Sequence, residues 1–158
     1  MPFLRALPLC LVLALPCFAQ GVADITTRDG WVVTRSAKGF DDLVDATRRA
    51  AAAGGLAVVT MAGPTDAAAR RGVDIPGNRV IGLFNNDFAV RILRLSTPAM
   101  IEAPIRVYVT ENADDSATLS YKLPSVVLAP YASEAPALEE VARELDAAFA
   151  AVADAALR

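Results

Sequence analysis

The stretch Ile105–Lys122, IRVYVTENADDSATLSYK, sets the fold class of this 158-residue chain. Apolar and polar side chains alternate along Ile105–Thr110, and they alternate again along Ala117–Lys122. Between these segments, Asn112–Ser116 is rich in Asn, Asp and Ser, which favour turns. Two alternating segments joined by a short turn predict an antiparallel hairpin, each strand of which buries one face.

Three segments upstream of the hairpin are also predicted to be strands. Trp31–Ser36 is rich in aromatic and β-branched residues, which favour strands. Leu56–Met61 has a similar character, and Arg79–Phe84 is almost continuously apolar, which indicates burial on both faces. The chain therefore contains five predicted strands.

Apolar residues at helical spacing mark three further segments. The first is Phe40–Ala51, the second is the short Phe88–Leu95, and the longest follows a predicted cap at Ser133 and reaches the C-terminus. Asp66–Arg71 is predicted to form one more short helix. Ser125–Tyr131 is bounded by prolines and is predicted to be a connection without regular structure.

The predicted order of elements is βαβ(α)β(α)ββα. Helices and strands mix without the regular alternation of a doubly wound sheet, so the sequence predicts an α+β fold. We expect a single domain over residues 31–158, with a mixed, mostly antiparallel sheet of about five strands and helices packed on it. Residues 20–30 are polar and turn-rich and are expected to form a flexible lead.

Residues 1–19 have the features of a secretory signal peptide. Arg5 precedes an apolar run, and the small residues Cys17 and Ala19 stand before a potential cleavage site. A membrane anchor is disfavoured because the apolar run is interrupted by prolines and is shorter than the roughly 20 residues that span a bilayer. A lipoprotein is disfavoured because Leu and Pro precede each cysteine. We therefore expect export to the periplasm or the medium, with no membrane span after processing.

Processing would remove both cysteines, and the chain contains no histidine. The mature protein would then lack thiol nucleophiles, disulfides, imidazole bases and the ligands of most zinc sites. We therefore expect no cofactor and no metal. The formal net charge of −3 becomes one unit more negative when Arg5 leaves, and basic residues do not cluster, so nucleic acid is not an expected partner.

The loop Asn85-Asn86-Asp87 is the first candidate ligand site. It follows a predicted buried strand and opens a predicted helix, whose free backbone N–H groups and positive dipole end can hold an anion. Arg91, one turn further on, and Arg79, at the start of the strand, could add positive charge. The alternative is an ordinary Asn/Asp helix cap, and the acidic Asp87 argues against an anion.

The second candidate is a polar cleft on the hairpin. Arg106 lies on the polar face of its strand, where Tyr108, Tyr121 and Glu102 could join it. The alternative is a solvated sheet face that carries ordinary cross-strand pairs.

Several motifs can be compared with known families. A predicted helix ends before Gly72–Pro76, the next strand runs into Phe84-Asn85-Asn86, Ala103-Pro104 opens the hairpin, and Tyr121–Pro124 closes it. Together they resemble the domain-of-unknown-function 302 family (DUF302), over most of the mature chain. The family has Gly-Asn-Pro where this chain has Phe84-Asn85-Asn86, so only Asn85 matches there. The resemblance implies an α+β domain that pairs with itself, in an exported bacterial member, and it implies no reaction.

These observations favour an exported binding or accessory domain, a homodimer that holds a small-molecule or anionic ligand or another envelope protein. The candidate ligand-binding residues are Asn85, Asn86, Arg91, Arg106 and Tyr121. Two alternatives stay open: an enzyme that uses carboxylates or an anion hole at these positions, and a structural assembly protein of the cell envelope. The chain has no nucleophile–base motif and no Gly-rich phosphate loop, which disfavours the enzyme.

Overall fold

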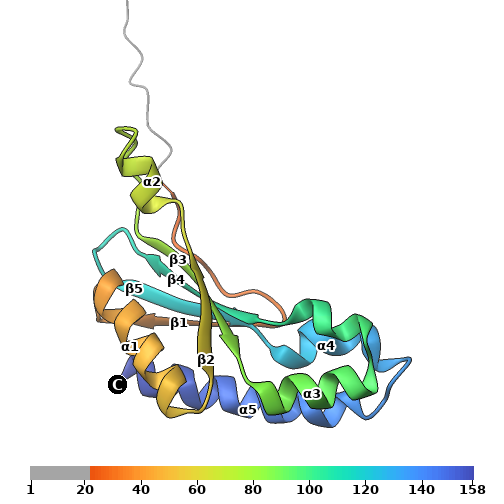
Figure 1. Cartoon of the computed structure of the whole chain (residues 1–158). Helices are drawn as coiled ribbons and strands as arrows, with labels where there is room; N and C mark the ends of the chain where they lie inside the picture. The colour runs from red at the N-terminus through yellow and green to blue at the C-terminus, as the bar shows by residue number, and fades with distance from the viewer. Residues whose placement is uncertain (1–21) are drawn as a thin grey trace, which may run out of the picture.

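The computed structural model describes residues 22–158, so the predicted signal peptide lies outside the described residues. It contains one five-stranded sheet in the order β1-β5-β4-β3-β2, and every neighbouring pair of strands is antiparallel (Figure 1). The elements in chain order are β1 (Trp31–Ser36), α1 (Phe40–Ala53), β2 (Ala57–Ala62), α2 (Thr65–Ala69), β3 (Asn78–Phe84), α3 (Asn86–Leu95), the 3-10 helix η1 (Pro98–Glu102), β4 (Ile105–Glu111), β5 (Ala117–Lys122), α4 (Pro124–Ala132) and α5 (Leu138–Leu157). The predicted α+β class is confirmed.

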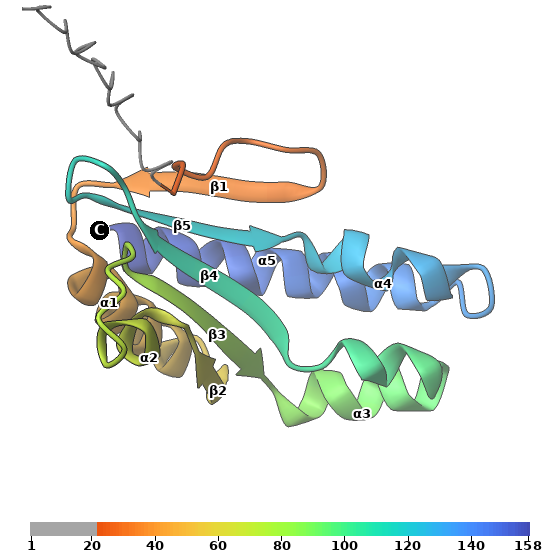
Figure 2. The same cartoon turned by 90° about the horizontal axis from the view of Figure 1, so that it is seen from above.

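Most of the helices lie on one side of the sheet and at one of its ends, while the short α2 lies at the opposite end, between β2 and β3. Figure 1 shows α1 and α5 beneath the strands, while α3 and α4 gather beyond the end of β3 and β5. Figure 2 looks onto the opposite face, and no helix of the described chain crosses it. This second face of the sheet is therefore open for contacts with something other than the core.

The core forms between α5, α1 and the covered face of the sheet. In α5 the buried residues follow helical spacing, as predicted: Leu138, Val141, Leu145, Phe149, Val152 and Ala156. In α1, Leu43 is fully buried, and Thr47 is buried with its hydroxyl donating to the Leu43 carbonyl at 2.7 Å. Because this polar group has a partner, its burial costs little.

Two boundaries differ from the prediction. Residues 124–132 form α4, where a connection was expected. Pro124 stands in the first turn of that helix, where a missing N–H costs no hydrogen bond, and Pro130 lies close to its end. Ser133 ends α4 and does not cap α5, which begins at Leu138. The two prolines therefore lie near the ends of a helix and do not mark a segment without regular structure.

The expectation that Arg79–Phe84 is buried on both faces is wrong for most of β3. Only Ile81, Gly82 and Leu83 are buried, and the remaining residues of the strand are half-buried. The reason is that helices cover only one face of the sheet, so the outward-facing residues of β3 reach the open face.

Residues 22–30 contain no helix or strand, and side chains such as that of Asp24 tie them to the sheet. Asp24 accepts a hydrogen bond from the Ala113 backbone N–H at 2.9 Å and lies 3.8 Å from the Arg35 guanidinium. The segment predicted to be a lead therefore contacts both β1 and the turn between β4 and β5.

The same turn contains a carboxyl group with a lowered pKa. Hydrogen bonds from Ser116, and then from Arg35 at 2.6 Å, lower the pKa of Asp114 from 3.8 to about 2. Since the folded-state pKa is lowered, Asp114 stabilises the fold above about pH 4 and loses this effect as the pH falls toward 2. We expect the difference in melting temperature between wild type and Asp114→Asn to shrink over that window. A difference that stays constant from pH 7 to pH 2 would contradict this assignment.

Candidate functional site

A groove of about 480 Å³ lies on the open face of the sheet, the face seen in Figure 2. Strands β1, β3, β4 and β5 supply most of its residues, and η1 and α4 contribute one residue each. The lining residues are Trp31, Asn78, Val80, Glu102, Ile105, Arg106, Tyr108, Tyr121, Lys122 and Val127. This volume falls within the range of ordinary small-molecule sites.

The strand register places two cations on this face. Lys122 lies opposite Trp31 in the β1–β5 pair, and Arg106 lies opposite Gly82 in the β3–β4 pair. A Cβ atom at position 82 would collide with Thr60 and Pro104. Glycine at this position therefore lets those two side chains pack directly on the backbone beside Arg106.

Trp31 offers an aromatic surface flanked by positive charge. The Lys122 ammonium lies 5.7 Å from the centre of the indole ring, and the Arg28 guanidinium lies 5.2 Å from it. Both distances are in the range of cation–π contacts, which restrict the ring and the cations together. The half-buried indole is thus a rigid apolar element next to two cations.

The two cations of the groove carry no opposite charge within the described chain. Among residues 22–158, neither Arg106 nor Lys122 forms an ion pair, although other arginines do. Arg35, for example, reaches Asp114 at 2.6 Å. The groove therefore presents two cations that make no direct ion pair, beside one carboxylate, Glu102, in the same lining.

Two tyrosine hydroxyl groups form hydrogen bonds with residues that line the groove. The Tyr108 hydroxyl accepts a hydrogen bond from the Asn78 side-chain amide at 2.6 Å, which leaves its own proton free to donate. At the η1 end, Glu102 accepts a hydrogen bond from the Tyr131 hydroxyl at 2.9 Å. This bond raises the pKa of Tyr131 above its ordinary value, because the protonated phenol is the donor to the carboxylate.

Tyr121 comes from the opposite side of the sheet from Arg106. It pairs in register with Val107, and its ring lies 5.6 Å from that of Phe149 in the core. Only 2 % of Tyr121 is exposed, and burial raises the pKa of its hydroxyl. Although Tyr121 borders the groove, its ring packs in the core and does not share the face of Arg106.

The Asn85 side chain caps α3. Its carbonyl oxygen accepts hydrogen bonds from the backbone N–H groups of Asp87 and Phe88, at 2.9 and 3.1 Å. Its amide donates to the Gly55 carbonyl at 2.9 Å. These bonds use two of the N–H groups on which the predicted anion site depended, while the neighbouring Asn86 is exposed at the first position of the helix.

We expect Asn85→Ala to lower the free energy of unfolding by about 1 kcal/mol, because a capping side chain is worth roughly that amount. Urea denaturation followed by circular dichroism measures this change. Asn86→Ala, which removes an exposed side chain next to the cap, is the matched control and should change stability by less than about 0.5 kcal/mol. Equal effects of the two substitutions would contradict the capping role.

Arg91 forms an ion pair with a residue of α5. Its guanidinium makes two hydrogen bonds of 2.6 Å with the carboxylate of Glu144. The pairing raises the pKa of Arg91 and lowers that of Glu144. The predicted site residues thus separate into two regions, with Asn85, Asn86 and Arg91 around α3 and Arg106 on the open sheet face.

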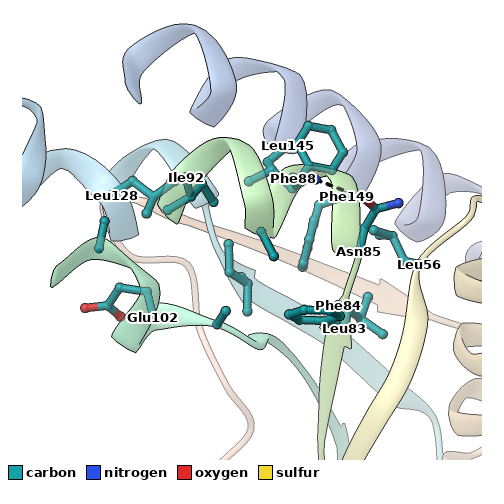
Figure 3. Close-up of a pocket in the computed structure, with 14 residues that line it drawn as sticks. Leu56, Leu83, Phe84, Asn85, Phe88, Ile92, Glu102, Leu128, Leu145 and Phe149 are labelled. Atoms are coloured by element: carbon teal, nitrogen blue, oxygen red, sulfur yellow. Dashed lines mark hydrogen bonds between the residues drawn. The ribbon is translucent and has the colours of Figure 1, made fainter. Parts of the chain in front are cut away.

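A second pocket beside Asn85 is small and apolar. It lies among β3, α3 and α5, and Figure 3 shows Phe88, Leu145 and Phe149 around it. Its free volume of about 30 Å³ has room for no more than a few water molecules. This pocket is a packing gap of the core and offers little to a polar ligand.

Sequence reasoning missed six residues of the groove, of which three are polar or aromatic: Trp31, Asn78 and Lys122. The alternation of side chains along β5 places Lys122 on the face opposite Leu119 and Tyr121. This pattern could have predicted that Lys122 lies on the same face as Arg106. Trp31 could not be placed, because its position depends on the pairing of β1 with β5, which are remote in sequence.

Residues 22–158 contain neither a membrane-spanning helix nor a cluster of metal ligands. No helix in this range is both long and apolar enough to cross a membrane. Within the same range, no three or more Asp, Glu, Cys or His residues are grouped so that they could hold a metal ion.

Comparisons with known proteins agree with this architecture. The model of the family described as domain of unknown function DUF302 matches residues 32–156. A crystal structure of an uncharacterised conserved DUF302 protein from Bacillus stearothermophilus superposes with a TM-score of 0.72 at 17 % identity, covering 83 % of this chain and 100 % of that one. No curated protein matches the sequence. Because the family model spans most of the chain, the protein belongs to the DUF302 family.

Proposed function

We propose that this protein is an exported binding domain whose sheet groove holds a small organic anion with an apolar or aromatic body. One observation carries the proposal: Arg106 and Lys122 share a groove of about 480 Å³ with Trp31, and neither cation has an ion-pair partner in the described chain. Both side chains are exposed at the open face, so their charges and N–H donors are accessible to an anionic ligand that enters the groove.

The residue types fit this class of ligand. Arginine can donate two parallel hydrogen bonds to a carboxylate, and lysine adds a point charge beside it. The face of Trp31 can pack against an apolar or aromatic group. The free proton of the Tyr108 hydroxyl supplies one more directed donor.

Export is the other part of the proposal, and it rests on residues 1–19. A protein exported to the periplasm or the medium would begin at Gln20 after cleavage. Mass spectrometry of the purified mature protein measures that N-terminus directly. An intact Met1 in a cytosolic fraction would contradict the proposed location.

Trp31 is the only tryptophan of the chain and lies in the groove, so its fluorescence reports on binding without a label. We would titrate the protein that begins at Gln20 with 3-phenylpropanoate, benzoate, phosphate and the neutral analogue 3-phenylpropanamide. Saturable changes in emission with the carboxylates, absent with the amide, are the expected result. Identical responses to the carboxylate and the amide would contradict an anion site, and the absence of any response would remove its support.

Self-association as a homodimer is also proposed. The edge strand β2 has no strand partner on its outer side within the described chain, and it contains no charged residue. Val59 and Met61 of this strand are 49 % and 40 % exposed. A second copy could pair along this edge through main-chain hydrogen bonds, in a two-fold symmetric arrangement. Light scattering after gel filtration should give twice the chain mass for wild type and one chain mass for Val59→Lys, whereas a monomeric wild type would contradict the proposal.

A further inference from the structure

The end of the sheet groove that holds Arg106 and Lys122 also carries a negative charge, supplied by Glu102 of η1. We infer that the ligand is zwitterionic: it places a carboxylate at Arg106 and Lys122 and an ammonium group at Glu102, as an α-amino acid with an apolar side chain does. This inference rests on the proposed function and narrows its class of ligand.

The opposite charges of the groove do not neutralise each other. Glu102 and Arg106 border the same cavity, yet no nitrogen of Arg106 or Lys122 lies within 4.0 Å of the Glu102 carboxylate. Elsewhere in the described chain, close opposite charges do pair: Arg91 and Glu144 are 2.6 Å apart. A groove that carries both charges without a direct ion pair between them can accept a molecule that carries a carboxylate and an ammonium group.

The Glu102 carboxylate is held in position by α4. Its Oε1 atom accepts the hydrogen bond of the Tyr131 hydroxyl at 2.9 Å. Its Oε2 atom accepts no hydrogen bond from the described residues, so that oxygen is available to a ligand. Glu102 is half-buried, which makes an uncompensated charge there more costly than on an exposed helix face. Tyr131 is therefore a positioning residue for this acceptor.

The presence of both charges in the groove also disfavours ligands that carry only a carboxylate or only an amine. A carboxylate without an amine would pair with Arg106 and Lys122 and leave Glu102 without a cationic partner, with only the Tyr131 hydroxyl as a donor. An amine without a carboxylate would satisfy Glu102 and face two cations. Each mismatch costs binding energy, so the groove should prefer the molecule that carries both groups.

Three probes with one phenyl body separate these cases: L-phenylalanine, 3-phenylpropanoate and 2-phenylethylamine. For wild type we expect L-phenylalanine to bind about tenfold to a hundredfold more tightly than 3-phenylpropanoate, the range that a charge-assisted hydrogen bond supplies. We expect 2-phenylethylamine to bind least tightly. Trp31 emission and titration calorimetry measure the three affinities.

Glu102→Gln should bring the affinities for L-phenylalanine and 3-phenylpropanoate close together. Tyr131→Phe keeps the charge of Glu102 and removes its positioning bond, so its preference for L-phenylalanine should be intermediate. Glu134→Gln, which changes an exposed carboxylate between α4 and α5, is the matched control and should keep the wild-type preference. A melting curve for each variant establishes that it is folded.

The outcomes separate this inference from the proposed function. If wild type binds 3-phenylpropanoate as tightly as L-phenylalanine, or if Glu102→Gln keeps the preference, the zwitterion inference is overturned and the anion site stands. If neither compound binds and no other carboxylate does, both are overturned. Wild-type preference for L-phenylalanine that disappears only in Glu102→Gln supports both.

Discussion

Arg106→Gln is expected to weaken the binding of carboxylates in the groove by about tenfold to a hundredfold. The reason is that the guanidinium of Arg106 is not shared with any carboxylate of the described chain, so all of its hydrogen-bonding capacity is available to the ligand. Glutamine keeps a polar amide with an N–H donor group, but it is shorter than arginine and has no charge. Lys122→Gln should have a smaller effect of the same sign, because an ammonium group makes no planar pair with a carboxylate.

Titration of Trp31 emission with 3-phenylpropanoate, in wild type and in Arg106→Gln, measures this difference. Arg49→Gln on α1 is the matched control, because Arg49 is exposed and does not border the groove. It should leave the affinity unchanged. Equal losses in Arg49→Gln and Arg106→Gln would mean that general charge attraction, and not the groove, accounts for binding.

Phe149→Ala is expected to lower the free energy of unfolding by about 3–5 kcal/mol. Phe149 is 2 % exposed in the middle of α5, and its ring packs 5.6 Å from that of Tyr121 on β5. It also borders the small apolar pocket of Figure 3. Truncation to alanine would therefore enlarge a cavity that the neighbouring side chains already leave unfilled, which adds to the destabilisation. Since this contact joins the longest helix to the hairpin, its loss weakens the packing between the two layers.

Urea denaturation followed by circular dichroism measures the change, with the slope of the transition showing whether unfolding remains two-state. Leu93→Ala on α3 is a suitable control, because Leu93 is also apolar but is 49 % exposed. It should change stability by less than about 0.5 kcal/mol. A cost below about 1 kcal/mol for Phe149→Ala would show that the ring is not part of a close-packed core.

Alternation of side chains predicted the burial of β4 well, whereas β5 is buried on both faces from Ala117 to Tyr121, which alternation did not predict. Along β4 the buried residues are Ile105, Val107 and Val109, the positions that the period of two selects. The same pattern cannot detect α4, whose apolar residues follow no helical period and whose prolines suggest a break. Only packing against α5 and η1 makes that segment helical.

The candidate site could be predicted only in part, and for similar reasons. The face of Arg106 follows from local alternation, whereas the neighbours of Arg106 depend on pairing between remote strands. The loop at Asn85 has the composition of an anion-binding loop. The Asn85 side chain, however, forms its hydrogen bonds with its own helix and with the Gly55 carbonyl. Only the folded structure shows which polar groups already have hydrogen-bond partners within the protein. That information favours the sheet groove over the Asn85 loop as the candidate site.

Backbone amide shifts in a titration with 3-phenylpropanoate, followed by ¹⁵N–¹H correlation spectroscopy of the mature protein, test the central claim most directly. The account predicts that the largest shifts fall on the open sheet face, at Trp31, Arg106 and Lys122. Shifts centred on Asn86 and Asp87 at the start of α3, or no shifts at any position, would contradict it.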